Sequence, residues 1–124
     1  MAHTALRHFP ACAVLVFGVP AFAFFNALAE EGIYRGVLQG SLERAFGEGA
    51  PPVIILATQA TAYAAAHYRG GFPNGASGYL MTLAYGILLG YLRRRTNGML
   101  SPCLAHFAAD LVIGYILVLV LLNS

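Results

Sequence analysis

The sequence is poor in charge. Asp, Glu, Lys and Arg together make up 10% of the residues, whereas a soluble domain carries about a quarter. This scarcity excludes an ordinary soluble domain. The formal net charge of +2 does not indicate a nucleic-acid partner either, because such sites need a clustered excess of basic residues.

Cysteine is scarce as well. The two cysteines, Cys12 and Cys103, lie in or beside apolar segments and have no CxxC spacing. This excludes the metal and redox motifs that depend on closely spaced cysteine pairs. We predict that both are buried free thiols.

Apolar residues dominate instead. They make up 59% of the chain, and the mean hydropathy is +0.69. A spanning helix needs ~20 mostly apolar residues, so 124 residues have room for about four. We predict an all-α fold, a polytopic membrane helix bundle of about four transmembrane helices, forming a single domain over residues 1–124. Turns rich in Gly and Pro place the helices at about 10–46, 52–68, 78–95 and 100–122.

The N-terminal segment has two interpretations. Arg7, the apolar run 11–25 and the sequence Ala27-Leu28-Ala29 have the outline of a cleaved signal peptide. The apolar character continues past that site, however, and this favours a first membrane helix that is kinked at Pro20 or begins after it.

The arginines predict the orientation. Cytoplasmic segments carry an excess of basic residues, so we expect Arg44 and the triplet 93–95 inside. Four spans then leave Arg7, Arg69 and both termini outside. The expected location is the bacterial inner (cytoplasmic) membrane.

Three glycines are spaced four apart in the first helix: Gly32, Gly36 and Gly40. Small residues at this spacing form a smooth ridge that another membrane helix can approach closely. We interpret the ridge as a packing surface within the chain, and it also allows self-association.

The stretch Ala29–Gly40 puts two carboxylates and an arginine into an apolar helix. Ionisable groups at membrane depth need partners and often mark functional sites. Glu31 and Arg35 are four residues apart, which predicts an ion pair along the helix. Glu30 lies ~100° away around the helix and has no local partner, so it is a candidate general base.

Other ionisable groups occur in two later helices, again in pairs four residues apart. Tyr63 precedes His67, and His106 precedes Asp110. A single membrane histidine is more often a hydrogen-bonded core residue than a catalyst. Two histidines and two further carboxylates, carried by three helices, favour one convergent site.

Axial distances raise a difficulty for such a site. At ~1.5 Å per residue, Glu30 and His67 should both lie ~22–24 Å from the cytoplasmic helix ends, but His106 only ~7 Å. The groups meet only if the first helix projects beyond the membrane or the last helix starts deep. A Glu30–His106 separation above about 12 Å would exclude a single site.

The three motifs E-E-x-x-x-R at 30–35, aromatic-x-x-x-H at 63–67 and H-x-x-x-D at 106–110 together resemble the CAAX-protease and bacteriocin-processing family. These intramembrane proteases include the Rce1-type prenyl-protein endopeptidases and bacterial Abi proteins. The flanks Y-R-G-V-L-Q-G-S-L-E-R-A-F-G and L-R-R-R-T-N-G-M-L-S-P-C-L-A-H are similar too. The resemblance covers roughly Ala29 to Val112.

The resemblance implies a role for each residue. Glu30 would activate the hydrolytic water, and His67 would share or orient it. His106 and Asp110 occupy the positions that stabilise the oxyanion, while Glu31 and Arg35 would support the structure or help to place the substrate.

Two positions depart from the family pattern. Tyr63 stands where phenylalanine is usual, and Asp110 stands where asparagine is common. Because an ionised aspartate cannot donate a hydrogen bond to an oxyanion, Asp110 must either be protonated or orient His106. We favour the second.

A metal-dependent mechanism is the alternative. Glu30, His67 and His106 could ligate zinc or another divalent ion, but the H-E-x-x-H motif of zinc peptidases is absent. We expect no cofactor.

We predict an endopeptidase whose substrate is a membrane-associated protein or peptide. Three other functions are compatible with parts of the sequence. A small four-helix proton-coupled transporter would need one essential carboxylate and neither histidine. Haem ligation by His67 and His106 would leave the E-E-x-x-x-R stretch unexplained. A non-catalytic scaffold or immunity protein would keep only the fold.

Overall fold

The computed structural model describes residues 11–124, and these are helical apart from short turns. A first helix runs unbroken from Ala11 to Phe46. Its successive parts are the π-helical η1 (Val14–Gly18), α2 (Val19–Glu31), the π-helical η2 (Gly32–Gln39) and α3 (Gly40–Phe46). A 3-10 turn, η3 (Gly47–Gly49), leads into α4 (Pro52–Arg69), α5 (Gly75–Thr96) and α6 (Leu100–Asn123).

The expected all-α membrane architecture is confirmed, with one difference. In the described part of the chain, three helices are long and apolar enough to cross a membrane: Ala11–Phe46, Gly75–Thr96 and Leu100–Asn123. The remaining long helix, α4, has 18 residues but is not one of these three. Its polar side chains, among them Gln59 and His67, lower its hydropathy. The chain is an integral, multi-pass membrane protein.

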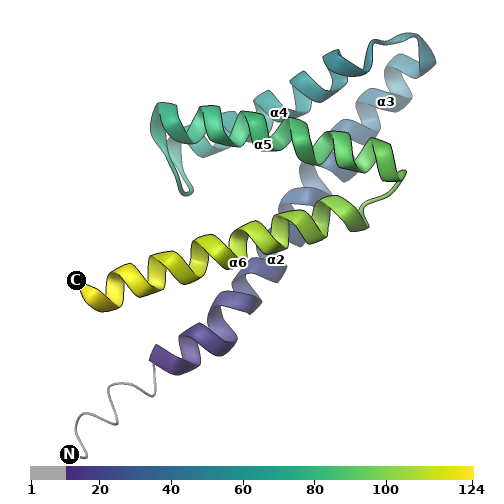
Figure 1. Ribbon diagram of the computed structural model, residues 1–124. Helices are drawn as coiled ribbons and strands as arrows, with labels where there is room; N and C mark the ends of the chain where they lie inside the picture. The colour runs from purple at the N-terminus through teal and green to yellow at the C-terminus, as the bar shows by residue number, and fades with distance from the viewer. Residues whose placement is uncertain (1–10) are drawn as a thin grey trace, which may run out of the picture.

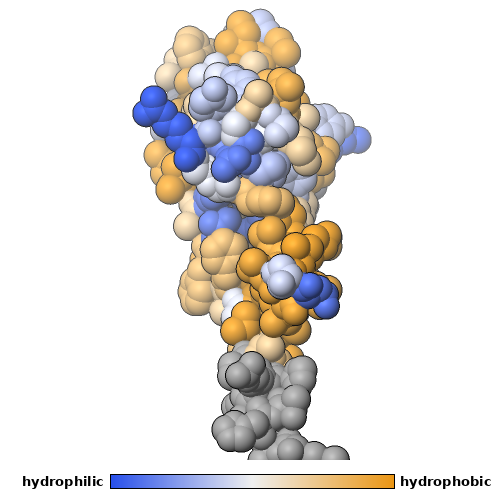
Figure 2. Space-filling model, turned by 90° about the vertical axis from the view of Figure 1, so that its left-hand side faces the viewer, coloured by the Kyte–Doolittle hydropathy of each residue, from blue (hydrophilic) through white to orange (hydrophobic). Residues whose placement is uncertain are grey.

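The helices form two pairs (Figure 1). α4 and α5 pack side by side as a hairpin, and α2 packs along α6. The α2–α6 contact is close at Gly114, where an added methyl group would lie 2.7 Å from a methyl carbon of Val19. Hydrophobic residues surround the C-terminal end of α6, whereas hydrophilic ones gather near the α4–α5 loop (Figure 2).

The helix boundaries agree with the turns predicted from the sequence. α5 ends at Thr96, and the next residue, Asn97, adopts the left-handed conformation (φ 51°). The N–H groups of Asn97 and Gly98 return to the carbonyls of Arg94 and Arg93 and close the turn. Pro20 lies inside the unbroken first helix, just after the π-helical η1, and the helix continues through it.

The π-helical segment η2 aligns a stripe of polar side chains. In an α-helix each step of four residues overshoots a full turn by about 40°, so Glu31 and Glu43 would point about 120° apart. Bonding from i to i+5 widens the turn beyond four residues and offsets this drift. Glu31, Arg35, Gln39 and Glu43 therefore all reach partners on α5 or α6.

The expected glycine ridge is used only at one end. Gly40 is buried, and a methyl group there would lie 3.3 Å from Nη2 of Arg93. Gly32 is exposed with open space around it. Close helix approach occurs instead on α5, where a methyl group at Gly90 would lie 2.5 Å from Nε2 of Gln59.

The prediction for the cysteines is half right. Both thiols are free, but Cys12 is exposed and Cys103 is half-buried. Cys12 lies near the start of the first helix, where the packed interior has not yet begun.

Candidate active site

His106 is the centre of the polar cluster. Its Nδ1 lies 2.7 Å from Oε1 of Glu31, and its Nε2 lies 3.3 Å from the hydroxyl of Tyr63. One carboxylate oxygen of Glu30 and one of Asp110 each lie 3.6 Å from the same Nε2. The first helix, α4 and α6 thus meet at one histidine.

The axial difficulty disappears because α6 starts deep. Met99, just before α6, has its methyl carbon 3.9 Å from where a methyl group on Gly36 would lie. Gly36 is six residues past Glu30, and His106 is six residues past Leu100. Both functional groups are therefore ~9 Å from the level at which the helices meet. The first helix extends beyond that level as α3.

The Nδ1 side of His106 is buried, and ionic contacts fix the side chains there. Glu31 and Arg35 are fully buried and form the expected ion pair, at 2.9 Å. Arg35 also donates to the carbonyl oxygen of Gly86 (3.3 Å), and its guanidinium carbon lies 4.4 Å from the ring centre of Tyr63. Because a carboxylate only accepts hydrogen bonds, Nδ1 carries the proton, and Nε2 points to the other side.

A second group of buried polar side chains, Gln39 and Gln59, lies next to Arg35. Gln59 donates to the carbonyl of Gly86 (2.8 Å), and Gln39 donates to the carbonyl of Gly90 (3.2 Å). Glycines on α5 leave room for these side chains to reach the backbone. Both glutamines are fully buried, so the layer fixes the first helix, α4 and α5 relative to one another.

The Nε2 side of His106 is open and rich in carboxylate. The Glu30 side chain is 23% exposed, against 0% for Glu31, and its Oε2 is buried with no hydrogen-bond partner. Asp110 is held by Asn26, whose amide donates to Oδ2 at 3.0 Å. An unpartnered carboxylate oxygen beside an imidazole nitrogen is suited to hold and deprotonate a water molecule.

His67 is less closely joined to the cluster than expected. Its Nδ1 donates to the carbonyl of Tyr63 on its own helix (3.2 Å), and the two rings lie 4.8 Å apart. Within residues 11–124 no carboxylate forms an ion pair with it. The described contacts link His67 to His106 through Tyr63, whose ring centre is 5.9 Å from that of His106.

Several residues in the site were not predicted. Tyr85 stacks edge-on to His106 and donates to the carbonyl of Ala105 (2.8 Å). Asn26 precedes Glu30 by four residues, and Gln39 follows Arg35 by four. That spacing was the signal for both, because isolated polar residues in a membrane helix tend to share its polar face.

The three residues expected as metal ligands do not converge. Among those the structure describes, no group of three His, Cys, Asp or Glu side chains is arranged to hold a metal ion. Glu30 and His106 approach each other, but His67 contacts Tyr63 instead. Glu30, His67 and His106 are therefore not arranged as the three ligands of one metal ion.

Comparison with known proteins supports a protease. A family model described as type II CAAX prenyl endopeptidase Rce1-like matches residues 12–112. That range contains every residue of the cluster around His106. Searches of curated proteins and of solved structures gave no match. The family match supports a CAAX-type intramembrane protease in general.

Proposed function

The chain belongs to the Rce1-like family of type II CAAX prenyl endopeptidases, and from this premise we propose that it hydrolyses a peptide bond of a membrane-associated protein or peptide. The substrate class includes lipidated or C-terminally anchored chains. The observation that carries the proposal is the unpartnered Oε2 of Glu30, 3.6 Å from Nε2 of a histidine whose other nitrogen is fixed by Glu31.

The reaction starts with water. Glu30 takes a proton from a water molecule, and the oxygen of that water attacks the scissile carbonyl carbon. The carbonyl oxygen becomes an oxyanion. His106 donates to it from Nε2 when the ring carries both protons, and the carboxylates of Glu31 and Asp110 balance the positive charge of the ring. The Tyr63 hydroxyl is a second donor on this side.

Collapse of the tetrahedral intermediate breaks the C–N bond. The proton held by Glu30 passes to the leaving amine, and the products are a carboxylic acid, which releases its proton to solvent, and an amine. Glu31 and Arg35 act as positioning residues, because their contacts set the orientation of the His106 ring. His67 stays a predicted participant, with Tyr63 as its contact to the site.

The test is proteolysis of a membrane-anchored peptide library by purified protein in detergent micelles. Glu30→Gln keeps the shape of the side chain and removes the base, so we expect turnover to fall by about 10²–10⁴-fold. His106→Ala should also abolish turnover. Arg69→Gln, an exposed change at the end of α4, is the matched control. Undiminished turnover in Glu30→Gln would refute the mechanism.

Two further arms separate the alternatives. We propose a metal-free reaction, so a chelator should leave turnover unchanged, and its inhibition would point to a metal. A transporter would show ion flux that needs Glu30 but tolerates His106→Ala. A scaffold or immunity protein would cleave no member of the library. The expected compartment is the bacterial inner membrane, which fractionation of expressing cells can test.

A further inference from the structure

A second polar pocket lies at the arginine-rich end of the bundle, away from His106. It has a volume of about 680 Å³, within the ~300–1,000 Å³ typical of small-molecule sites. Its walls come from α3, η3, the start of α4 and the end of α5. Glu31 and Glu43 are twelve residues apart on the first helix, so the pocket lies roughly 18 Å from the catalytic cluster.

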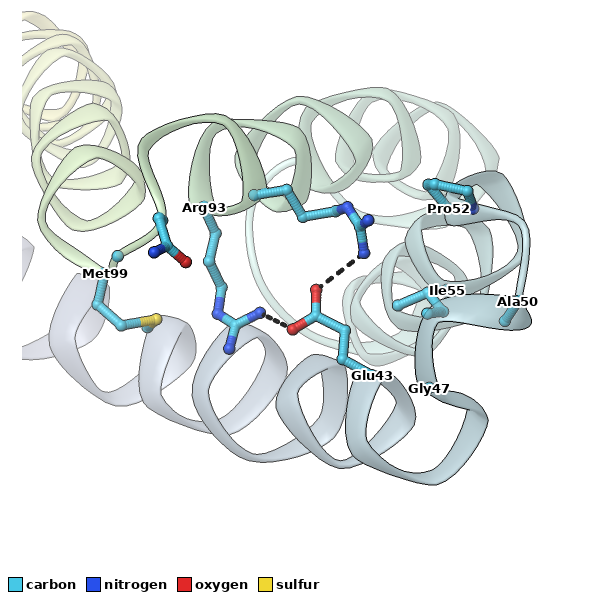
Figure 3. Close-up of a pocket in the computed structure, with 10 residues that line it drawn as sticks. Glu43, Gly47, Ala50, Pro52, Ile55, Arg93 and Met99 are labelled. Atoms are coloured by element: carbon cyan, nitrogen blue, oxygen red, sulfur yellow. Dashed lines mark hydrogen bonds and ion pairs between the residues drawn. The ribbon is translucent and has the colours of Figure 1, made fainter.

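Figure 3 shows the charged core of this pocket, where the Glu43 carboxylate points between two guanidinium groups. Its Oε2 pairs with Arg93, and its Oε1 lies 3.2 Å from Arg94. A third guanidinium is close, since a methyl group at Gly40 would lie 3.3 Å from Arg93 and 3.4 Å from Arg44. One carboxylate thus faces two arginines of the pocket wall, whereas Arg44 lies outside that wall and donates to Ser41 on its own helix.

These arginines keep unused donors. A guanidinium has five N–H groups, and each of Arg93 and Arg94 uses one nitrogen, Nη1, on Glu43. Their side chains are 20% and 34% exposed, so the remaining donors are accessible. Planar guanidinium groups bind phosphate oxygens in bidentate fashion. The pocket therefore has the charge and the donors for a phosphate group.

The position of the pocket selects the source of that phosphate. It is built where α3 and α5 end and α4 begins, the level expected for a membrane surface. Basic pockets between membrane helices on the cytoplasmic side bind anionic lipid headgroups. A peptide substrate bound at Glu30 would have to extend by about five or six residues, at ~3.3 Å each, to reach this pocket. We propose that this pocket binds the phosphate of an anionic phospholipid headgroup.

The proposal predicts selective lipid binding, measured on the full chain in detergent and independently of proteolysis. Short-chain phosphatidylglycerol should bind, and short-chain phosphatidylcholine should bind at least tenfold more weakly. Arg93→Gln and Arg94→Gln should each weaken phosphatidylglycerol binding about fivefold. Arg95→Gln is the matched control, because it removes the same charge from the same triplet outside the pocket wall, and its effect should stay below twofold.

Three results would overturn the proposal. Equal losses from Arg93→Gln, Arg94→Gln and Arg95→Gln would show diffuse surface attraction in place of a site. Equal affinity for the two lipids would remove the role of charge. Inorganic phosphate binding as tightly as phosphatidylglycerol would reassign the pocket to free phosphate. Arg94→Gln keeps the Arg93–Glu43 pair intact, and unchanged helicity by circular dichroism verifies that each variant is folded.

Discussion

The two sides of the His106 ring differ in almost every physical respect. On the Nδ1 side, Glu31 and Arg35 are fully buried and held by an ion pair. On the Nε2 side, Glu30 and Asp110 are partly exposed, although the Oε2 atoms of Glu30 and Glu31 alike are buried without a hydrogen-bond partner. The first side fixes the ring, and the second leaves groups free to meet a substrate. Adjacent glutamates, alike in sequence, thus receive opposite tasks from the helix face on which each lies.

The largest effect is expected from a substitution on the Nδ1 side of the His106 ring. Arg35→Met removes the cation from a fully buried pair and leaves the Glu31 charge with the N–H of His106 as its remaining partner. Removing one partner of a buried pair costs about 3–5 kcal/mol, so the protein should lose most of its stability. Thermal unfolding in detergent measures the loss. Arg69→Met, at an exposed arginine, should change the midpoint little, and an equally small change in Arg35→Met would show that Glu31 has another source of compensation.

A smaller effect, of opposite sign, is expected on the open side. Asp110→Asn keeps an oxygen that can accept from Asn26 and adds an amide donor near Nε2 of His106. An amide can stabilise an oxyanion where a carboxylate cannot. Turnover should stay at the wild-type level or rise, by up to about tenfold. A drop of more than tenfold in kcat would mean that Asp110 acts as a carboxylate.

The smallest effect is expected where the two sides meet. Tyr63 faces Arg35 with its ring and His106 with its hydroxyl. Tyr63→Phe keeps the ring and removes one hydrogen bond, worth about 1 kcal/mol. We expect kcat to fall about fivefold with little change in the unfolding midpoint. A fall in the unfolding midpoint without a fall in kcat would show that the hydroxyl stabilises the fold and takes no part in turnover.

The sequence predicted what local geometry determines. The Glu31–Arg35 pair followed from a spacing of four on a helix, and the convergence on His106 followed from the need of membrane charges for partners. Sequence reasoning could not find which carboxylate holds the ring, because that depends on how α6 is placed against the first helix. Glu31 at 2.7 Å takes the orienting contact that we had assigned to Asp110, which lies at 3.6 Å.

The remaining differences also come from tertiary packing. His67 carries a motif residue, yet its first contact is the backbone of its own helix, an outcome that the spacing in the sequence does not distinguish from a direct role. Gly32 looked like a packing position because the ridge was read along one helix alone. Among the described residues, no side chain lies within 4 Å of a methyl group added at Gly32, whereas Arg93 of α5 contacts the helix at Gly40.

The π-helical segment η2 determines which way the side chains after it point around the axis of the first helix. Deleting one residue between Gly32 and Gln39 would let η2 close into α-helical turns, because eleven α-helical steps leave Glu31 and Glu43 only about 20° apart. Gln39 and Glu43 would still face α5, and Glu30 and Glu31 would stay at His106. The widened turns of η2 therefore accommodate one extra residue in the first helix and keep the cluster around His106 and the pocket around Glu43 on one side of the bundle.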